Sequence, residues 1–269
     1  MQHHPPASSS ALTYTSYLKV HELLSLQERK SSPPEHDEML FIVIHQVYEL
    51  WFKQIIHEMA FLQNALESND APRAAHTFKR ILTILKTLVA QIDVLETMTP
   101  LSFASFRGRL ESASGFQSVQ FRQVEFILGN KNARMLEHHR HDPQSTAALT
   151  QAFQARTLYD SFLRFLAANG FSIPSAILTR DVTAAIPQDE NVRSELLRAY
   201  RTHPTAAAIC ERMVDLDEGL QEWRYRHVKM VERTIGSKMG TGGSAGVDYL
   251  RSTLFRPHFP DLWTIRAEL

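Results

Sequence analysis

Cysteine is nearly absent from this sequence, because Cys210 is the only one among 269 residues. A single thiol cannot form an internal disulfide, and it cannot supply the ligand set of a zinc or iron–sulfur site. Few disulfides are typical of a reducing compartment. We therefore expect a cytoplasmic protein.

An excess of charge of either sign is also missing, since 29 Lys and Arg residues balance 29 Asp and Glu residues. No overall field would draw such a chain to nucleic acid or to an anionic membrane. No run approaches the roughly 18 apolar residues that a membrane span needs. We expect no nucleic-acid partner and no membrane partner. The polar beginning has no apolar stretch of a signal peptide, so we expect disorder over residues 1–11.

The alternation typical of strands is missing as well, whereas apolar residues recur at helical spacing almost everywhere. The pattern predicts an all-α fold, a bundle of long antiparallel helices that forms one domain over residues 12–269. Within it, residues 12–28 form an amphipathic N-terminal arm that we expect on a neighbouring subunit. One long helix is expected to begin at the end of SSPPEHDE, and a second to run from Pro72 to Thr99. Further helices are expected over 115–129, 157–168, 189–202, 204–235 and 247–254. Residues 101–114 are expected to form a loop, and residues 131–150 a loose connection.

Several metal-site motifs are absent. The sequence has no Glu-x-x-His of a di-iron bundle and no His-Glu-x-x-His of a zinc protease. Without Cys-x-x-Cys-His, any haem would be held noncovalently. The histidines of EHHRH at 137–141 lie in a polar stretch, where solvated side chains are the better interpretation.

Two histidines on apolar helix faces are candidates for a site. His227 lies on the apolar face of the helix expected over 204–235, and His45 lies on a face with several aromatic residues. On position alone, each is better interpreted as a core histidine bonded to a carbonyl. The alternative is an axial haem ligand, because a neutral imidazole in an apolar pocket can hold iron. The same-face neighbours at helical spacing are Leu220, Trp223, Met230, Val231 and Thr234 for His227, and Phe41, Tyr48, Glu49 and Phe52 for His45.

Arg107 and a glycine-rich segment are further candidates. Arg107 stands among the apolar residues Phe103, Phe106 and Leu110, so its guanidinium could grip a carboxylate at a pocket edge. A surface salt bridge is the alternative. The segment GTGGSAG at 240–246 follows a helix and not a strand, which disfavours a dinucleotide site. A flap that binds an anion and a plain linker remain equal alternatives.

Five segments, taken in order, resemble the tryptophan 2,3-dioxygenase family. They run from about residue 12 to the C-terminus, and SGFQS and GTGGSAGV within them are intact. The segments are LTYTSYL, HDEMLFIVIHQVYELWFKQIIHE, FRGRLESASGFQSVQFRQVEFILGNKN, EWRYRHVKMVERTIGSKMGTGGSAGVDYL and HFPDLW. The resemblance implies a homotetramer of helical subunits, each with one noncovalent haem b that is ferrous in the active form. It also implies that both atoms of O2 enter the indole C2–C3 bond of L-tryptophan, giving N-formylkynurenine.

The resemblance implies roles for single residues. His227 in WRYRH matches the proximal iron ligand, and His45 in VIHQ matches the catalytic distal histidine near the indole N–H. Arg107 is similar to the arginine that binds the substrate carboxylate, and Thr241 to the residue that contacts the amino-acid head group. Further implied contacts are Phe41, Phe103 and the neighbouring subunit's counterparts of Tyr14, Tyr17 and Leu18 for the substrate, and Ser114, Trp223, Gly240 and Gly242 for the haem.

Two other functions stay open at this point. A related haem oxygenase could act on another indole or aromatic amino acid. A haem-binding sensor without turnover would be a protein of a different class. Arg107 and Thr241 argue against a sensor, because a gas sensor does not need to hold an amino-acid head group.

Overall fold

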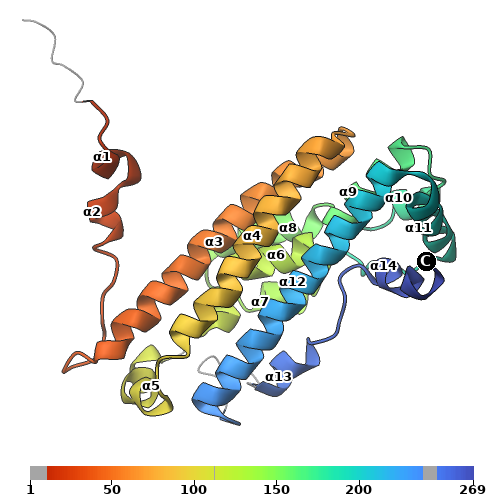
Figure 1. Cartoon of the computed structure of the whole chain (residues 1–269). Coiled ribbons are helices and arrows are strands. Elements are labelled where there is room, and N and C mark those ends of the chain that lie inside the picture. Colours follow the sequence, from red (N-terminus) through yellow and green to blue (C-terminus); the bar gives the residue numbers. More distant parts are fainter. Residues whose placement is uncertain (1–10, 112, 239–246) are drawn as a thin grey trace, which may run out of the picture.

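The computed structural model describes residues 11–111, 113–238 and 247–269. All regular structure in these ranges is helical, with no strand among them, which confirms the all-α prediction (Figure 1). Three long helices lie side by side: α3 (His36–Glu67), α4 (Ala71–Leu95) and α12 (Pro204–Ile235). Each had been expected from its helical spacing of apolar residues, and α12 has the bounds that the sequence predicts.

Local signals explain where these helices begin and turn. Asp70 caps α4 by accepting a hydrogen bond from the backbone N–H of Arg73, and Pro72 fits the first turn, where no N–H partner is needed. The preceding Asn69 takes a left-handed conformation with φ +58°, which lets α3 reverse directly into α4. Helices α3 and α4 then bury a continuous set of apolar side chains together with α12. This set includes Ile55, Leu62, Phe78, Ile81 and Leu88.

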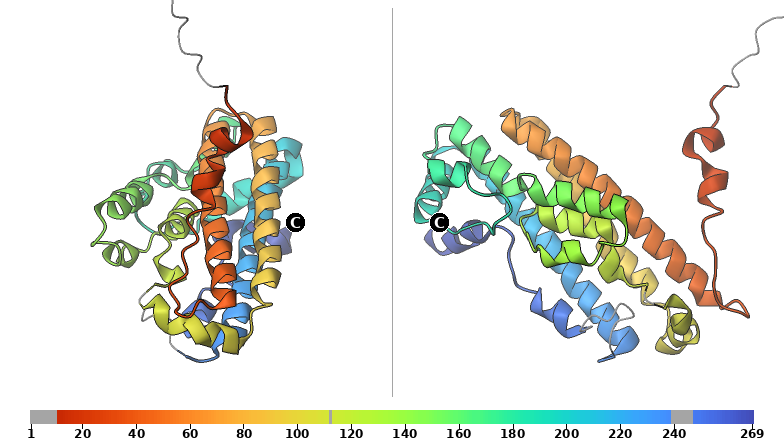
Figure 2. Two further views of the ribbon diagram at one scale, coloured as in Figure 1. Left: turned by 90° about the vertical axis from the view of Figure 1, so that its left-hand side faces the viewer. Right: turned by 180° about the vertical axis from the view of Figure 1, so that it is seen from behind.

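A second set of helices packs on the other side of α3. It consists of α6 (Val119–Ile127), α7 (Arg134–Glu137), α8 (Pro143–Gln154) and α9 (Leu158–Ala168). Figure 2 shows these helices as a separate layer, which in its right-hand view lies in front of the long helices. The prediction of a loose connection over 131–150 was wrong. Asp142 caps α8 and Pro143 starts it, and Leu149 packs against Phe126 and Met135 in a small core of its own.

The segment after Thr99 is also helical, where a loop had been expected. The Thr99 hydroxyl accepts the N–H of Ser102, and Pro100 begins α5 (Pro100–Arg107). This helix buries Phe103 and Phe106. Two short 3-10 turns follow, η1 (Gly108–Leu110) and η2 (Gly115–Gln117), so the helix predicted from Gly115 is interrupted before α6. Gly129, with φ +104°, ends that region as predicted.

The remaining helices lie around α12 (Figure 1). Helices α10 (Ser175–Leu178), α11 (Glu190–Thr202) and α14 (Pro260–Thr264), with η3 (Ile265–Glu268), lie near its N-terminal end, whereas α13 (Val247–Ser252) lies beside its C-terminal end, where Arg251 pairs with Glu232. Buried Asp217 of α12 holds the C-terminal part, α14 and η3, in place, because its carboxylate accepts hydrogen bonds from the backbone of His258 and Phe259 and from the indole of Trp263.

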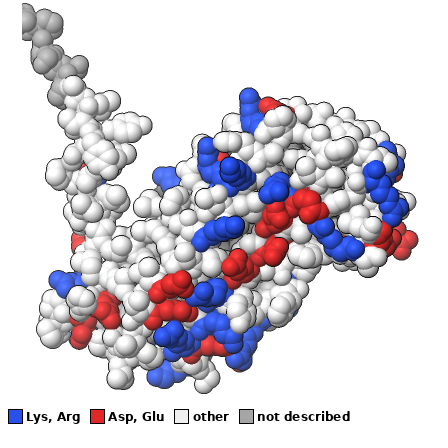
Figure 3. Space-filling view, viewed as in Figure 1, with Lys and Arg blue, Asp and Glu red and all other residues white. Residues whose placement is uncertain are grey.

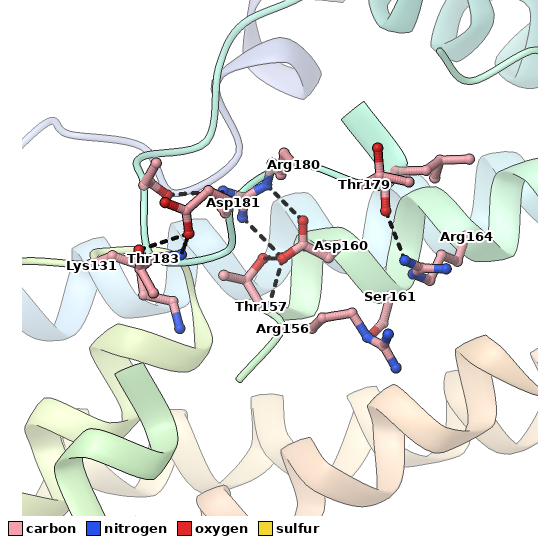
Figure 4. A network of polar contacts seen from close by, with 12 residues as sticks. Lys131, Arg156, Thr157, Asp160, Ser161, Arg164, Thr179, Arg180, Asp181 and Thr183 are labelled. Carbon is pink, nitrogen blue, oxygen red and sulfur yellow. Dashed lines mark hydrogen bonds and ion pairs between the residues drawn. The ribbon is translucent and has the colours of Figure 1, made fainter. Parts of the chain in front are cut away.

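A polar network fastens the connection between α9 and α11 (Figure 4). Arg180 reaches back from this connection and forms two hydrogen bonds, of 2.8 and 2.9 Å, to the carboxylate of Asp160. Asp160 in turn accepts the backbone N–H of Thr157 at the start of α9. Both charged side chains are almost fully buried, so the pair forms a rigid link inside the protein.

The N-terminal arm stands away from the helical body (Figures 1 and 2). It contains α1 (Tyr14–Leu18), capped by Thr13, and α2 (Val20–Leu23); Lys19, with φ +54°, divides what the sequence suggested as one amphipathic segment. At its base, Gln27 donates a hydrogen bond of 2.6 Å to Gln46 on α3. The arm shows mostly uncharged surface, whereas acidic and basic side chains alternate over α4 and α12 (Figure 3).

Helix α3 is the one described helix that is long and apolar enough to cross a membrane by length and composition. It also carries two buried carboxylates, Glu38 and Glu58, and it packs against α4, α6 and α9.

Candidate functional site

His45 on α3 and His227 on α12 are brought within electrostatic reach of each other. Burial and, to a smaller extent, the neighbouring His45 lower the pKa of His227 to about 4. Neither ring nitrogen of His227 has a hydrogen-bond partner among the residues that the structure describes, so it is not a core histidine bonded to a carbonyl. At neutral pH it is an uncharged imidazole with an available lone pair.

His45 differs because one of its ring nitrogens is engaged. Its Nδ1 lies 2.7 Å from the carbonyl oxygen of Phe41, one turn earlier on α3. A carbonyl can only accept, so Nδ1 carries the proton and Nε2 is left as an acceptor. Burial lowers the pKa of His45, although this hydrogen bond and the charge of Glu49 oppose the shift. The second imidazole thus presents a fixed acceptor for an N–H group.

Aromatic rings from α3 and α5 line the space beside His45. The Phe41 ring lies 4.0 Å from the His45 ring, 5.8 Å from Phe103 and 5.6 Å from Phe106, between centroids. Phe103 and Phe106 meet edge to face at 5.4 Å. These contacts form an apolar wall suited to a flat aromatic ligand.

Arg107 ends α5 directly after this wall. It is partly buried and lies one helical turn beyond Phe103. The loop position expected from the sequence is therefore replaced by the last turn of a helix. Arg107 thus follows Phe103 and Phe106 on the same helix, and a guanidinium is a group that suits a ligand carboxylate.

Trp223 backs the other histidine. Its indole is buried and stacks on the His227 imidazole, with centroids 5.3 Å apart and planes only 10° apart. Spacing on α12 predicted that these two residues share a face. The sequence did not predict the aromatic rings that surround Trp223, because Phe121 comes from α6 and Phe52 from α3.

A buried ionic cluster beside this site was also missed. Glu125 on α6 pairs with Arg122 on the same helix and with Arg224 on α12, and all three side chains are buried. The Arg122 guanidinium lies 4.8 Å from the Phe116 ring centroid, just after Ser114, whose hydroxyl caps η2. Nothing in the spacing of these charges along the sequence indicates that they meet.

Two groups of expected site residues are not brought to this place. Tyr14 and Tyr17 are 77% and 72% exposed on the arm, and Leu18 is exposed beside them, away from the histidines of their own subunit. Gly240, Thr241 and Gly242 lie outside the described residues.

Other metal sites are disfavoured. Burial raises the pKa of Cys210 to about 12, which keeps its thiol protonated and supports the interpretation as inert packing. Across residues 11–111, 113–238 and 247–269, no group of three or more His, Cys, Asp and Glu side chains could hold a metal ion. The expectation that the histidines at 137–141 are solvated was wrong for His139, which is buried.

The fold and the site together define a class of protein: an all-helical bundle in which two neutral histidines from different helices lie within electrostatic reach of each other, each against aromatic rings. Comparison with known proteins defines the family. The family model described as tryptophan 2,3-dioxygenase matches residues 1–205 and 194–269, and the chain belongs to this family.

Close relatives match over nearly their whole length. The tryptophan 2,3-dioxygenase of Herpetosiphon aurantiacus is 59% identical over 261 residues, which cover 97% of this chain and 100% of the relative. The tryptophan 2,3-dioxygenase of Anaeromyxobacter dehalogenans is 57% identical over 265 residues, which cover 98% and 99%. That of Kineococcus radiotolerans is 45% identical over 261 residues, which cover 96% and 91%.

The family is haem-dependent, and the residues present fit a haem. Two uncharged imidazoles of the described site have a lone pair for iron, His227 on α12 and His45 through Nε2 on α3. Trp223, Phe121 and Phe52 provide a buried aromatic backing behind His227.

Proposed function

We propose that this protein catalyses the reaction after which its relatives are named, the insertion of O2 across the indole C2–C3 bond of L-tryptophan to give N-formylkynurenine. The observation that carries the proposal is the meeting of neutral His45 and His227 beside Phe41 in a chain of this family. Haem iron, when bound, supplies the activation of O2. Both oxygen atoms end in the product, so no external reductant is consumed in turnover.

His227 would hold the iron, and one noncovalent haem b per subunit would lie between α3 and α12. Ser114 at the start of η2, together with Trp223, Gly240 and Gly242, would complete the haem contacts. The neutral state of His227 supports this assignment, because a protonated imidazole has no lone pair for iron.

The substrate would lie with its indole against Phe41 and Phe103. Since the Phe41 carbonyl fixes the proton of His45 on Nδ1, the free Nε2 would accept the hydrogen bond of the indole N–H. This contact orients the ring, and it holds the substrate by a group that other aromatic amino acids lack.

The head group of the amino acid needs polar partners, because burying it without them would cost several kcal/mol. Arg107, at the edge of the aromatic wall, would bind the carboxylate through two parallel N–H donors. Thr241 would contact the head group from the glycine-rich segment. With these assignments, the aromatic residues of α5 bind the ring of the substrate and Arg107 binds its carboxylate.

The arm supports a homotetramer. Its exposed apolar side chains would be costly in a monomer, and an exposed stripe of α3, Met39, Val43 and Leu50, offers a surface of the same kind. We propose that Tyr14, Tyr17 and Leu18 complete the substrate site of a neighbouring subunit. In the double variant Tyr14→Ser/Tyr17→Ser, the KM for L-tryptophan should rise while haem content stays unchanged.

Activity is tested with purified protein that is loaded with haem, reduced, and supplied with L-tryptophan and air. We expect N-formylkynurenine, detected by absorbance and mass. Haem-loaded protein that forms no product would refute the proposed reaction. In parallel, His227→Ala should abolish stable haem binding, and full haem occupancy with an unchanged spectrum would show that another residue is the ligand.

The head-group assignment has its own test. Arg107→Ala should raise the KM for L-tryptophan by about 30-fold, the loss of charge-assisted hydrogen bonds worth about 2 kcal/mol, with haem content intact. Arg109→Ala is the matched control, because Arg109 is exposed on η1 only two residues away. Equal KM values in the two variants would remove the role of Arg107.

A further inference from the structure

Aromatic rings from three helices surround Trp223. It stacks on His227 in its own helix, and Phe121 of α6 lies 5.1 Å away between centroids. Phe52 of α3 meets it at 6.1 Å with an interplanar angle of 89°. In a core packed this closely, the indole cannot turn without displacing its neighbours, so its plane is fixed.

Tyr48 is the remaining aromatic neighbour of Trp223, and it carries a hydroxyl group. Its ring lies 6.3 Å from Trp223, and its hydroxyl donates a hydrogen bond of 2.5 Å to the carbonyl oxygen of Leu88 on α4. Burial raises the pKa of Tyr48 to about 12, an effect that the Trp223 N–H and Arg226 oppose. The phenol therefore stays protonated and anchored to the backbone of a third long helix.

The indole N–H of Trp223 has an unusual position. Its Nε1 is buried and has no hydrogen-bond partner among the described residues. The contact between Trp223 and Tyr48 is therefore one between rings, with centroids 6.3 Å apart and an interplanar angle of 55°. Because the Tyr48 hydroxyl donates its proton to Leu88, the ring that packs on the indole is held by the backbone of α4.

We propose that Tyr48 is a positioning residue for the proximal histidine, acting through Trp223. The anchor on Leu88 fixes the phenol, the phenol fixes the indole, and the indole fixes the plane of the His227 imidazole. The inference rests on the proposed ligation of iron by His227. Groups behind a ligating histidine set its orientation and change metal affinity by about 10- to 100-fold.

The arrangement also joins the two sides of the site. Tyr48 lies three residues after His45 on α3, so both project from neighbouring turns of one helix. Helix α3, which presents His45 as the acceptor for the substrate, thereby also holds the iron ligand His227 on α12 in position. A shift of α3 would therefore change the positions of both histidines.

The test uses the full haem-loaded protein with Tyr48→Phe, which keeps the ring and removes the hydroxyl. We expect the haem content at equilibrium to stay close to that of the wild type. Three quantities should change. Haem should transfer to apomyoglobin about tenfold faster, the iron–histidine stretching band in the resonance Raman spectrum of the ferrous protein should shift or broaden, and the reduction potential should differ. Tyr225→Phe is the matched control, because Tyr225 is an exposed tyrosine of α12. Trp223→Phe, which removes the N–H, should change the same three quantities in the same direction.

A Raman band, a reduction potential and a haem transfer rate that match those of Tyr225→Phe would overturn the inference. A lower melting temperature with all three unchanged would overturn it as well, since a purely structural role predicts that pattern. His227→Ala separates the proposed function from the inference. If the iron–histidine band persists in that variant, His227 is not the ligand, and the inference fails with that assignment whatever Tyr48→Phe shows.

Discussion

The indole N–H of Trp263 donates a hydrogen bond of 3.0 Å to Oδ2 of Asp217, and through this contact α12 holds the C-terminal helices. The same oxygen accepts the backbone N–H groups of His258 and Phe259, and Oδ1 accepts from Gln221. One buried carboxylate thus satisfies four donors that would otherwise be without partners. Its removal should therefore cost more than an ordinary polar substitution.

Asp217→Ala should lower the free energy of unfolding by about 3 kcal/mol, because several buried donors lose their acceptor at once. The melting temperature, followed by circular dichroism, should fall by roughly 2–4 °C for each kcal/mol. Asp215→Ala is the control on the same helix, since Asp215 pairs with Arg212 at the surface. Equal losses in the two variants would contradict the anchoring role of Asp217.

The pair of Arg180 and Asp160 should be equally sensitive. Arg180→Leu leaves the buried Asp160 without its partner, so we expect a loss of about 3–5 kcal/mol in urea unfolding. Arg156→Leu removes a more exposed pair with Glu67 near the same helix and should cost less than about 1 kcal/mol. A small effect of Arg180→Leu would mean that the connection before α11 is held by its other contacts.

His258 should make stability depend on pH. Burial and the charge of Arg224 together lower its pKa to about 4, although Asp217 opposes the shift. The unfolded chain, with a histidine pKa of about 6.5, then binds one proton more than the folded protein between about pH 4 and pH 6.5. The free energy of unfolding should therefore fall as the pH falls through this window, and the histidine contributes no loss above it.

His258→Gln tests this effect, because glutamine keeps polar atoms but does not titrate. The difference in slope between wild type and variant should approach about 1.4 kcal/mol per pH unit within the window, the value for one proton. Urea unfolding at several pH values measures it. His21→Gln on the exposed arm should leave the slope as in the wild type. Identical slopes for all three proteins would place the acid sensitivity elsewhere.

Gly129 should tolerate no side chain. Its φ of +104° is strained for other residues, and a Cβ at this position would lie 2.4 Å from Cδ1 of Ile186. We expect Gly129→Ala to cost about 1–3 kcal/mol in the free energy of unfolding. Gly170→Ala is an informative comparison, because Gly170 has φ +82° but no atom within 4 Å of its Cβ position. The contact with Ile186 predicts that the Gly129 variant is the less stable of the two.

The sequence predicted the long elements of the fold because their signals are local. The cap at Asp70, Pro72 behind it, and the apolar spacing along α12 suffice to place those helices. Helices α5 and α8 were missed although each begins with a local signal, Thr99 before Pro100 and Asp142 before Pro143. Few of their residues are buried, so the apolar spacing is weak, and contacts with distant residues hold them, such as Leu149 against Phe126. Propensity alone is weak there.

The contacts in the site also fall into those that the sequence predicts and those that it does not. His227 and Trp223 share a helix face, so their proximity follows from spacing. The neighbours that fix them do not, because Tyr48, Phe121 and Leu88 come from three other helices. The deprotonated Nε2 of His45 is likewise invisible in a sequence, since it depends on where the Phe41 carbonyl points. The roles of Thr241 and of the arm remain predictions.

Helix α12 carries the anchor of the C-terminal part at Asp217 and, ten residues later, the histidine assigned to the iron. Ten residues of α-helix span about 15 Å, so the anchor lies within about three turns of the iron ligand. We expect the colour of the haem-loaded protein to report on the unfolding of α12. An absorbance trace during heating then serves as a stability assay for every variant described above that binds haem.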